Sequence, residues 1–150
     1  MPDAAAAAGR APLAGAARYH RPMNTSLPII RLKSDRLPGH PWIWSAQVQK
    51  PEQRIAPGTV VEIQDPAGRQ VGHGFWNGHA RIALRLLSNQ PGQMPDADWI
   101  EQRIARAVAL RRDELQLDRH ANAWRVIHSE GDGLSGLGVD RYADTLVIEY

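Results

Sequence analysis

The feature that most constrains this chain is the length of its apolar runs between Leu27 and Leu87. Each run is short, and Gly, Pro, Asp or Arg interrupts it. Runs of this kind are typical of β-strands, because a helix needs at least about ten residues. None approaches the roughly 18 apolar residues that a bilayer-spanning helix needs. The pattern predicts a small sheet structure and argues against a membrane protein.

Strand-like segments recur along this first half of the chain. They are Leu27–Leu32, Trp42–Trp44, Gly58–Ile63, Gln70–Trp76 and Ala80–Leu87. The turn sequence Asp65–Gly68 predicts that the third and fourth segments form a hairpin. In the last segment Ile82, Leu84 and Leu86 would share one face, and Arg81, Ala83 and Arg85 the other. Short strands at this spacing predict a small barrel or sandwich.

The apolar period changes after Pro95. A set of apolar residues recurs at helical spacing, namely Ile100, Ile104, Ala107, Val108 and Leu115. Asp96 or Asp98 can cap the beginning, and Arg111 and Arg112 lie near the end, where cations favour the helix dipole. The pattern predicts a helix over residues 97–115.

The last part of the chain returns to strand-like patterns. Trp124–His128 and Thr145–Tyr150 are predicted strands, joined by a glycine-rich connection over residues 129–144. Because two strands are only marginally stable and leave open edges, we expect the chain to be a fragment of a longer protein. We also expect it to aggregate unless the residues after about 120 are removed.

Charge is distributed unevenly along the chain. Residues 27–90 hold eight basic and four acidic residues, whereas residues 91–150 hold seven and eleven. All the basic residues except Lys33 and Lys50 are arginine, which binds phosphate with two donors and stacks on bases. The asymmetry is consistent with an anion-binding module followed by an acidic one, although an arginine-rich genome composition would also produce it.

The composition excludes several kinds of chemistry within these residues. The chain has no cysteine, so disulfides, thiolate metal sites and a cysteine nucleophile are excluded. Residues 1–26 are mainly Ala, Gly, Pro and Arg, which predicts a disordered tail. Arg10 and Pro12 interrupt its apolar stretch, so a signal peptide is not supported and we expect a cytoplasmic protein. Met23 is a candidate for the true start.

Two groups of motifs resemble a known family. The first comprises His40–Ser45, Gly58–Ile63, Asp65–Gly68 and Val71–Asn77. The second and more specific one is Arg125 with Glu130–Tyr142, which is similar to the pattern E-x-D-G-L-P-G-L-x-V-D-R-Y. Together they resemble the RlmI-like family of large-subunit ribosomal RNA cytosine-5 methyltransferases over about residues 27–150. This chain has Ser135 where the family pattern has proline, which removes a preset turn without removing a charge.

The resemblance implies an α+β fold in which RNA binding and methyl transfer belong to different domains. It implies a PUA-like RNA-binding barrel over residues 27–95, a linking helix over 96–118, and the start of a central α+β domain over 119–150. The Rossmann-like domain that would bind S-adenosylmethionine and supply a cysteine nucleophile is absent from this chain. The resemblance therefore implies ribosomal RNA as the partner, leaves a homodimer of the full-length protein open, and implies that the 150 residues alone are inactive.

The candidate functional residues fall into two sets. The RNA-binding candidates are Lys33, Arg36, Arg81, Arg85 and Trp42. Trp44, Phe75 and Trp76 are further stacking candidates, but we expect at least two of the four aromatics to be core residues. The second set forms a loop facing the active site of the full-length enzyme: Arg125, Glu130, Asp132, Gly133, Asp140 and Arg141. The residues themselves also allow a plain glycine-rich hairpin in which Asp140 and Arg141 pair or cap a turn.

Alternative functions remain open at this level. One is a stand-alone RNA-binding module without catalysis. Another is a hydrolase that uses Asp132 and Asp140, but nothing near them in the sequence supplies a nucleophile or metal ligands. His73 and His79 have no carboxylate or cysteine at metal-ligand spacing, so no metal site is predicted. His128 beside Glu130 could form a proton-transfer pair, but a histidine at a strand end is more often packed or solvated, and we assign it no role.

Overall fold

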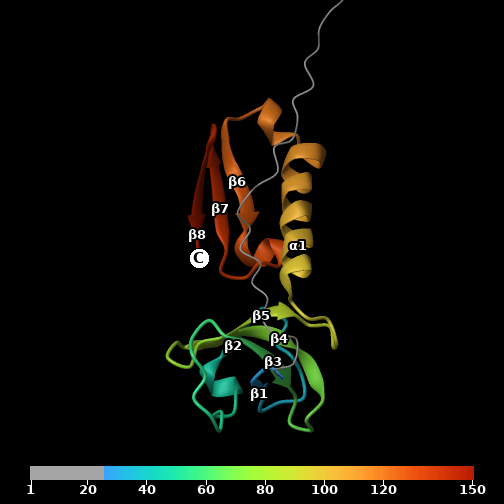
Figure 1. Ribbon diagram of the computed structural model, residues 1–150, viewed down its shortest axis with the longest axis vertical. Coiled ribbons are helices and arrows are strands. Elements are labelled where there is room, and N and C mark those ends of the chain that lie inside the picture. The colour runs from blue at the N-terminus through green and yellow to red at the C-terminus, as the bar shows by residue number, and fades with distance from the viewer. Residues whose placement is uncertain (1–25) are drawn as a thin grey trace, which may run out of the picture.

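The structure is a computed structural model that describes residues 26–150. The predicted disordered tail, apart from its last residue, and Met23 lie outside the described residues. Two lobes follow one another along the long axis of the molecule, a β-sheet lobe and a helix-plus-sheet lobe (Figure 1). The helix α1 (Ala97–Ala109) begins where the first lobe ends and runs along the second.

The first lobe is a curled five-stranded sheet. Its strands are β1 (Ile29–Arg31), β2 (Trp42–Trp44), β3 (Val60–Gln64), β4 (Gln70–Trp76) and β5 (Ile82–Ser88). They lie in the order β1-β3-β4-β5-β2, with β1 parallel to β3 and the other pairs antiparallel. The two outer strands also meet, because Lys33 N donates to Gln47 O and Gln49 N to Arg31 O, both at 2.8 Å. These bonds bend the sheet toward the predicted small barrel.

The barrel encloses an apolar core built from all five strands. Its buried residues are Ile30, Leu32, Ile43, Val48, Val61, Ile63, Trp76, Ala83 and Leu84. The alternation predicted for β5 is only partly correct, since Ala83 is buried beside Leu84 and Ile82 and Leu86 are half-buried. The register of β5 shifts against both neighbouring strands, and such bulges rotate side chains away from strict alternation.

The helix predicted over residues 97–115 is confirmed as a continuous helical segment. α1 runs directly into a π-helical turn, η2 (Leu110–Glu114). The side chain of Asp96 caps the beginning by accepting a hydrogen bond from Trp99 N at 2.9 Å. Among the apolar residues of this segment, Trp99 and Ala107 are buried whereas Ile100 and Leu115 are exposed. The sheet of the second lobe packs against the turn of the helix that carries Trp99.

The second lobe has one strand more than predicted. Its strands β6 (Ala123–His128), β7 (Gly138–Tyr142) and β8 (Thr145–Glu149) form an antiparallel sheet in that order. β7 lies within the connection that we expected to be irregular. Short 3₁₀ turns, η3 (Leu117–Arg119) and η4 (Ser129–Asp132), flank β6. α1 and this sheet share a second core formed by Trp99, Ala107, Ile127, Leu134 and Val139.

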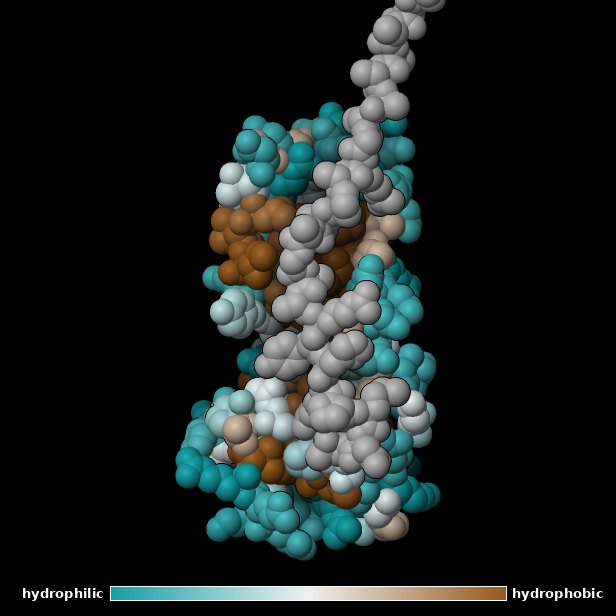
Figure 2. Space-filling model, in the orientation of Figure 1, coloured by the Kyte–Doolittle hydropathy of each residue, from teal (hydrophilic) through white to brown (hydrophobic). Residues whose placement is uncertain are grey.

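The outer strand β8 exposes its apolar side chains. Leu146, Val147 and Ile148 are 56%, 48% and 57% exposed. Figure 2 shows the hydrophobic surface that gathers on this side of the second lobe. An edge strand with exposed apolar residues is prone to associate with other chains, as expected from the sequence. No helix within residues 26–150 is long and apolar enough to cross a membrane.

Candidate nucleic-acid interface

A single carboxylate joins the two lobes. Glu130, in η4, accepts hydrogen bonds at Oε1 from three side chains: Trp42 Nε1 at 2.8 Å, Ser135 Oγ at 2.9 Å and Arg85 NH1 at 3.1 Å. Trp42 and Arg85 belong to the barrel, whereas Ser135 lies in the loop before β7. The serine that replaces the family's proline therefore acts as a donor to the carboxylate at the joint.

The environment of Glu130 favours its charged form. Burial by itself raises the pKa of this carboxyl group, but hydrogen bonds from Trp42, Ser129 and Ser135 outweigh that effect and lower its pKa to about 2. Glu130 is therefore ionised at neutral pH, and its negative charge faces the guanidinium of Arg85. The joint between the lobes is a charge-assisted hydrogen-bond cluster.

Two arginine–tryptophan pairs lie side by side on the β2–β5 ladder. The Arg85 guanidinium lies over the Trp42 ring at 5.6 Å, and that of Arg81 over the Trp44 ring at 6.0 Å. The register aligns Trp42 with Arg85, and Ser45 N donates to Arg81 O at 2.9 Å. The ladder therefore brings together three of the predicted RNA-binding residues, Trp42, Arg81 and Arg85.

The Arg81–Trp44 pair and Arg85 border a cavity between the lobes of about 860 Å³. Trp44, Phe75, Arg81 and Arg85 of the barrel line one side. The loop segment 135–137 and Tyr150 of the second lobe line the other. Two guanidinium groups and no carboxylate are among the lining side chains, so the cavity suits an anion with a flat apolar part.

The remaining predicted cations lie elsewhere on the barrel surface. Lys33 Nζ donates to Ala46 O at 2.9 Å, in the 3₁₀ turn η1 (Ser45–Gln47) that follows Trp44. Lys33 thus lies near the Trp44–Arg81 pair. Arg36 is exposed in the loop after β1, and no contact places it with the others. The structure groups four of the five predicted residues around the β2–β5 edge.

The expectation that at least two of the four aromatics would be core residues is wrong. Only Trp76 belongs to the buried core, at 6% exposure. Trp42 and Phe75 are half-buried, and Trp44 is 43% exposed. The reason is that Trp42, Trp44 and Phe75 sit at the joint between the lobes, a surface that only the tertiary arrangement creates.

The charged residues of the loop are largely engaged within the chain. Asp132 accepts hydrogen bonds from Arg111 and from His128 N. Asp140 binds Arg125 with two hydrogen bonds, at 2.7 and 2.8 Å, across β6 and β7. These bonds lower the pKa of both aspartates, against the opposing effect of burial, which is the largest single influence on Asp132. Both aspartates are therefore engaged in ion pairs with arginines of the same lobe.

Arg141 and Gly133, the other two members of this set, each lie in a defined structural environment. The Arg141 guanidinium lies over the Trp124 ring at 4.5 Å, and its Nε donates to Ala143 O at 2.6 Å. Gly133 has φ of +69°, and a Cβ there would meet the Arg103 guanidinium. Of the plain hairpin alternative, Arg141 does bond to the turn at Ala143, whereas Asp140 pairs with Arg125 and not with Arg141. Arg111 and Arg103, which sequence analysis did not place in this set, also lie against the loop, at Asp132 and Gly133.

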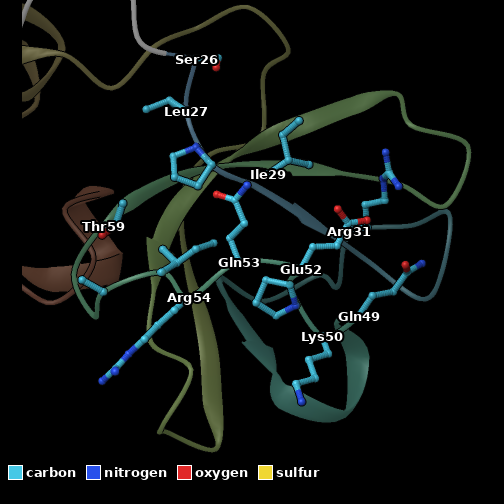
Figure 3. Close-up of a pocket in the computed structure, with 14 residues that line it drawn as sticks. Ser26, Leu27, Ile29, Arg31, Gln49, Lys50, Glu52, Gln53, Arg54 and Thr59 are labelled. Atoms are coloured by element: carbon cyan, nitrogen blue, oxygen red, sulfur yellow. The ribbon is translucent and has the colours of Figure 1, made fainter.

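A second cavity, of about 590 Å³, lies on the opposite edge of the barrel (Figure 3). Arg31 of β1 and Lys50 and Arg54 of the segment after β2 line it, together with Glu52. Sequence reasoning did not select these residues, because their spacing forms no motif. Only the excess of basic residues in the first half of the chain pointed to this surface.

The described residues do not fit S-adenosylmethionine. A dinucleotide-type site of this kind uses a glycine-rich turn between a strand and a helix N-terminus. α1 instead begins at the Asp96 cap after Pro95, and the cap side chain occupies the backbone N–H of Trp99 in the first turn. Residues 26–150 also contain no cluster of three or more potential metal ligands. We therefore assign no step of methyl transfer to these residues.

Comparison with known proteins supports the fold described above. Residues 34–89 match the family described as PUA-like domain. The crystal structure of SMU.776, provisionally described as a methyltransferase and complexed with SAH, shares the fold, with a TM-score of 0.59 at 16% identity. The match covers 73% of this chain and 28% of that one. The first lobe is thus a PUA-like domain.

Sequence relatives give the family. The "Ribosomal RNA large subunit methyltransferase I" of Erwinia tasmaniensis is 32% identical over 110 residues, covering 73% of this chain and 28% of that protein. The protein of the same name from Aeromonas hydrophila is 30% identical over 128 residues, covering 85% and 32%. The "Ribosomal RNA large subunit methyltransferase" of Deinococcus radiodurans is 30% identical over 135 residues, covering 83% and 33%. The chain belongs to the RlmI-like family and spans about 28% to 33% of the length of these relatives.

Proposed function

We propose that this chain is the RNA-recognition part of an S-adenosylmethionine-dependent ribosomal RNA methyltransferase that acts at carbon 5 of cytosine. The observation that carries the proposal is the pair of Arg–Trp contacts, Arg81–Trp44 and Arg85–Trp42, on one edge of a PUA-like domain. Guanidinium groups bind phosphate and indole rings stack on bases, which is the combination that RNA recognition uses. The names of the relatives support ribosomal RNA as the substrate class, and a ribosomal RNA substrate supports the proposal of a cytoplasmic protein.

The residues of this chain would bind and orient RNA rather than catalyse. Lys33, Arg36, Arg81 and Arg85 are proposed phosphate contacts, and Trp42 is a proposed stacking contact. Glu130, Asp132 and Asp140 would act indirectly, by holding the loop that we propose faces the reaction centre of the longer protein. The methyl donor and the nucleophile would come from a part of that protein outside these residues, so we expect the 150-residue chain alone to be inactive.

Two measurements test this proposal. The first is the affinity of the chain for a fragment of large-subunit ribosomal RNA, compared with an Arg81→Ala/Arg85→Ala variant. We expect the variant to bind at least ten-fold more weakly and with a shallower dependence on salt, because two phosphate contacts are lost. Arg106→Ala/Arg112→Ala on the helix removes the same charge and serves as the control. Equal binding by all three proteins would contradict RNA recognition by this edge.

The second measurement concerns the enzyme. The coding DNA downstream of Tyr150 should encode a strand, a glycine-rich loop and a cysteine-bearing segment. The protein that contains them should methylate cytosine in the RNA, whereas the 150-residue chain should not. An immediate stop codon would favour the alternative, a stand-alone RNA-binding module. Methylation by the short chain itself would contradict the division of labour proposed here.

A further inference from the structure

The cavity between the lobes has the chemistry of a site for one unstacked nucleotide. Its flat walls are the exposed ring of Trp44 and the half-buried ring of Phe75. Arg81 lies against Trp44 at the rim. Among residues 26–150 no carboxylate forms an ion pair with Arg81. An aromatic wall beside an uncompensated guanidinium is complementary to a base joined to a phosphate.

The opposite wall and the floor are suited to the polar edge of a base. The segment 135–137 lines the cavity opposite the barrel, where Leu137 adds an apolar contact. Asn77 also lines the cavity, and its Oδ1 accepts from His79 N at 3.1 Å, which fixes the amide in place. An amide held in this way can hydrogen-bond to a base edge through its NH₂ group.

The volume of the cavity is compatible with a bound nucleotide. A volume of about 860 Å³ lies within the range of small-molecule sites, roughly 300–1,000 Å³, and exceeds what a water cluster alone would need. A paired base inside a duplex could not reach these walls, because its faces are covered by its neighbours. The walls are therefore accessible only to a base that has left its stack.

We propose that the cavity between the barrel and the β7 loop binds an unstacked nucleotide of single-stranded RNA, with its base against Trp44 and Phe75 and its phosphate on Arg81. This inference rests on the proposed RNA-binding function and adds the site and the single-stranded form of the ligand. Trp44 and Phe75 are then specificity-determining contacts, whereas the cations at the rim serve any RNA.

Two labelled probes test the site: a short polyuridine oligonucleotide and a blunt-ended RNA duplex of matched length. We expect Trp44→Ala to weaken binding of the single strand about ten-fold and binding of the duplex less than about two-fold, because one base–aromatic stack is lost. Trp44→Phe should retain most of the affinity. Arg81→Ala should weaken both probes. Arg119→Ala, at the far end of the second lobe, removes the same charge and should change neither.

The failures of the two proposals can be told apart. If the wild-type chain binds neither probe, RNA recognition itself is wrong and this site falls with it. If it binds both and Trp44→Ala leaves single-strand binding unchanged, only the cavity site is overturned. Ultraviolet crosslinking of the polyuridine probe gives a second readout, expected on peptides that contain Trp44 or Phe75. Crosslinks confined to other peptides, or a dimer that Trp44→Ala dissociates, would also overturn the site. Circular dichroism confirms that each variant is folded.

Discussion

Trp42 of the barrel donates a hydrogen bond to Glu130 of the second lobe at 2.8 Å, across 88 residues of sequence. The same oxygen accepts from Arg85 and Ser135, so one carboxylate fixes the edge of the PUA-like domain against the loop before β7. Two of the RNA-binding candidates, Trp42 and Arg85, and the family's loop motif are therefore parts of one hydrogen-bonded cluster.

Replacing Glu130 should destabilise the joint between the lobes. Glu130→Ala leaves the Trp42, Arg85 and Ser135 donors without their acceptor, which costs about 1–3 kcal/mol of unfolding free energy. Chemical denaturation measures this loss. Glu101→Ala, an exposed glutamate on α1, is the matched control and should stay within about 0.5 kcal/mol of the wild type. A Glu130→Ala protein as stable as the control would show that the cluster does not hold the lobes together.

Acid should weaken the same joint. The pKa of Glu130 is about 2 in the folded chain, against an ordinary value of 4.5. A lowered folded-state pKa stabilises the protein above the ordinary value, and the contribution is lost as pH falls from about 4.5 toward 2. Urea denaturation of Glu130→Gln over this range should show a shallower loss of stability than the wild type. Identical slopes for the two proteins would argue against this linkage.

His73 should make the stability of the fold depend on pH at higher pH values than Glu130 does. Burial lowers the pKa of this histidine below its ordinary value of 6.5, although Glu62 opposes the shift. The unfolded chain therefore binds a proton that the folded chain resists, and stability falls as pH drops below about 6.5. The melting temperature between pH 7.5 and pH 5 measures the effect. His73→Gln should flatten this dependence, whereas His120→Gln, on the surface, should leave it intact.

Gly133 is predicted to be more sensitive to substitution than Gly136. Both have positive φ, but a Cβ meets the Arg103 guanidinium only at Gly133, while the space beside Gly136 is open. Gly133→Ala should displace Arg103 from the Trp99 ring and cost about 0.5–1 kcal/mol more than Gly136→Ala in denaturation experiments. In an Arg103→Ala background the two substitutions should cost the same. A difference that persists there would point to a cause other than this contact.

The exposed face of β8 should control aggregation. Leu146→Thr/Ile148→Thr removes apolar surface from an open edge strand, so less aggregate should form at a given concentration while the fold is kept. Light scattering measures the aggregate, and circular dichroism the fold. Val71→Thr in the half-buried part of the barrel is a comparison that should not reduce aggregation. Unchanged scattering after the β8 substitutions would place the cause of aggregation elsewhere.

The sequence alone determined the elements whose signals are local. Turn residues at 65–68 marked the β3–β4 hairpin, and Asp96 with the apolar period marked the helix, because each depends on neighbours along the chain. The conserved-looking spacing of Glu130–Tyr142 was enough to identify the family. β7 was missed because the glycines that precede and begin it, Gly133, Gly136 and Gly138, are typical of a loop, and the apolar period of the helix did not include Trp99, which α1 buries.

Only the tertiary structure decided how the candidate residues work. At least two of the four aromatics Trp42, Trp44, Phe75 and Trp76 were expected to be core residues, yet only Trp76 is, and the other three lie at a joint that exists only once the second lobe packs against the barrel. Asp132, Asp140 and Glu130 were candidates for an active-site loop, yet each is held by an arginine distant in sequence. Local pattern specifies strands and caps, whereas the partner of a charge or a ring depends on contacts between segments that the pattern does not encode.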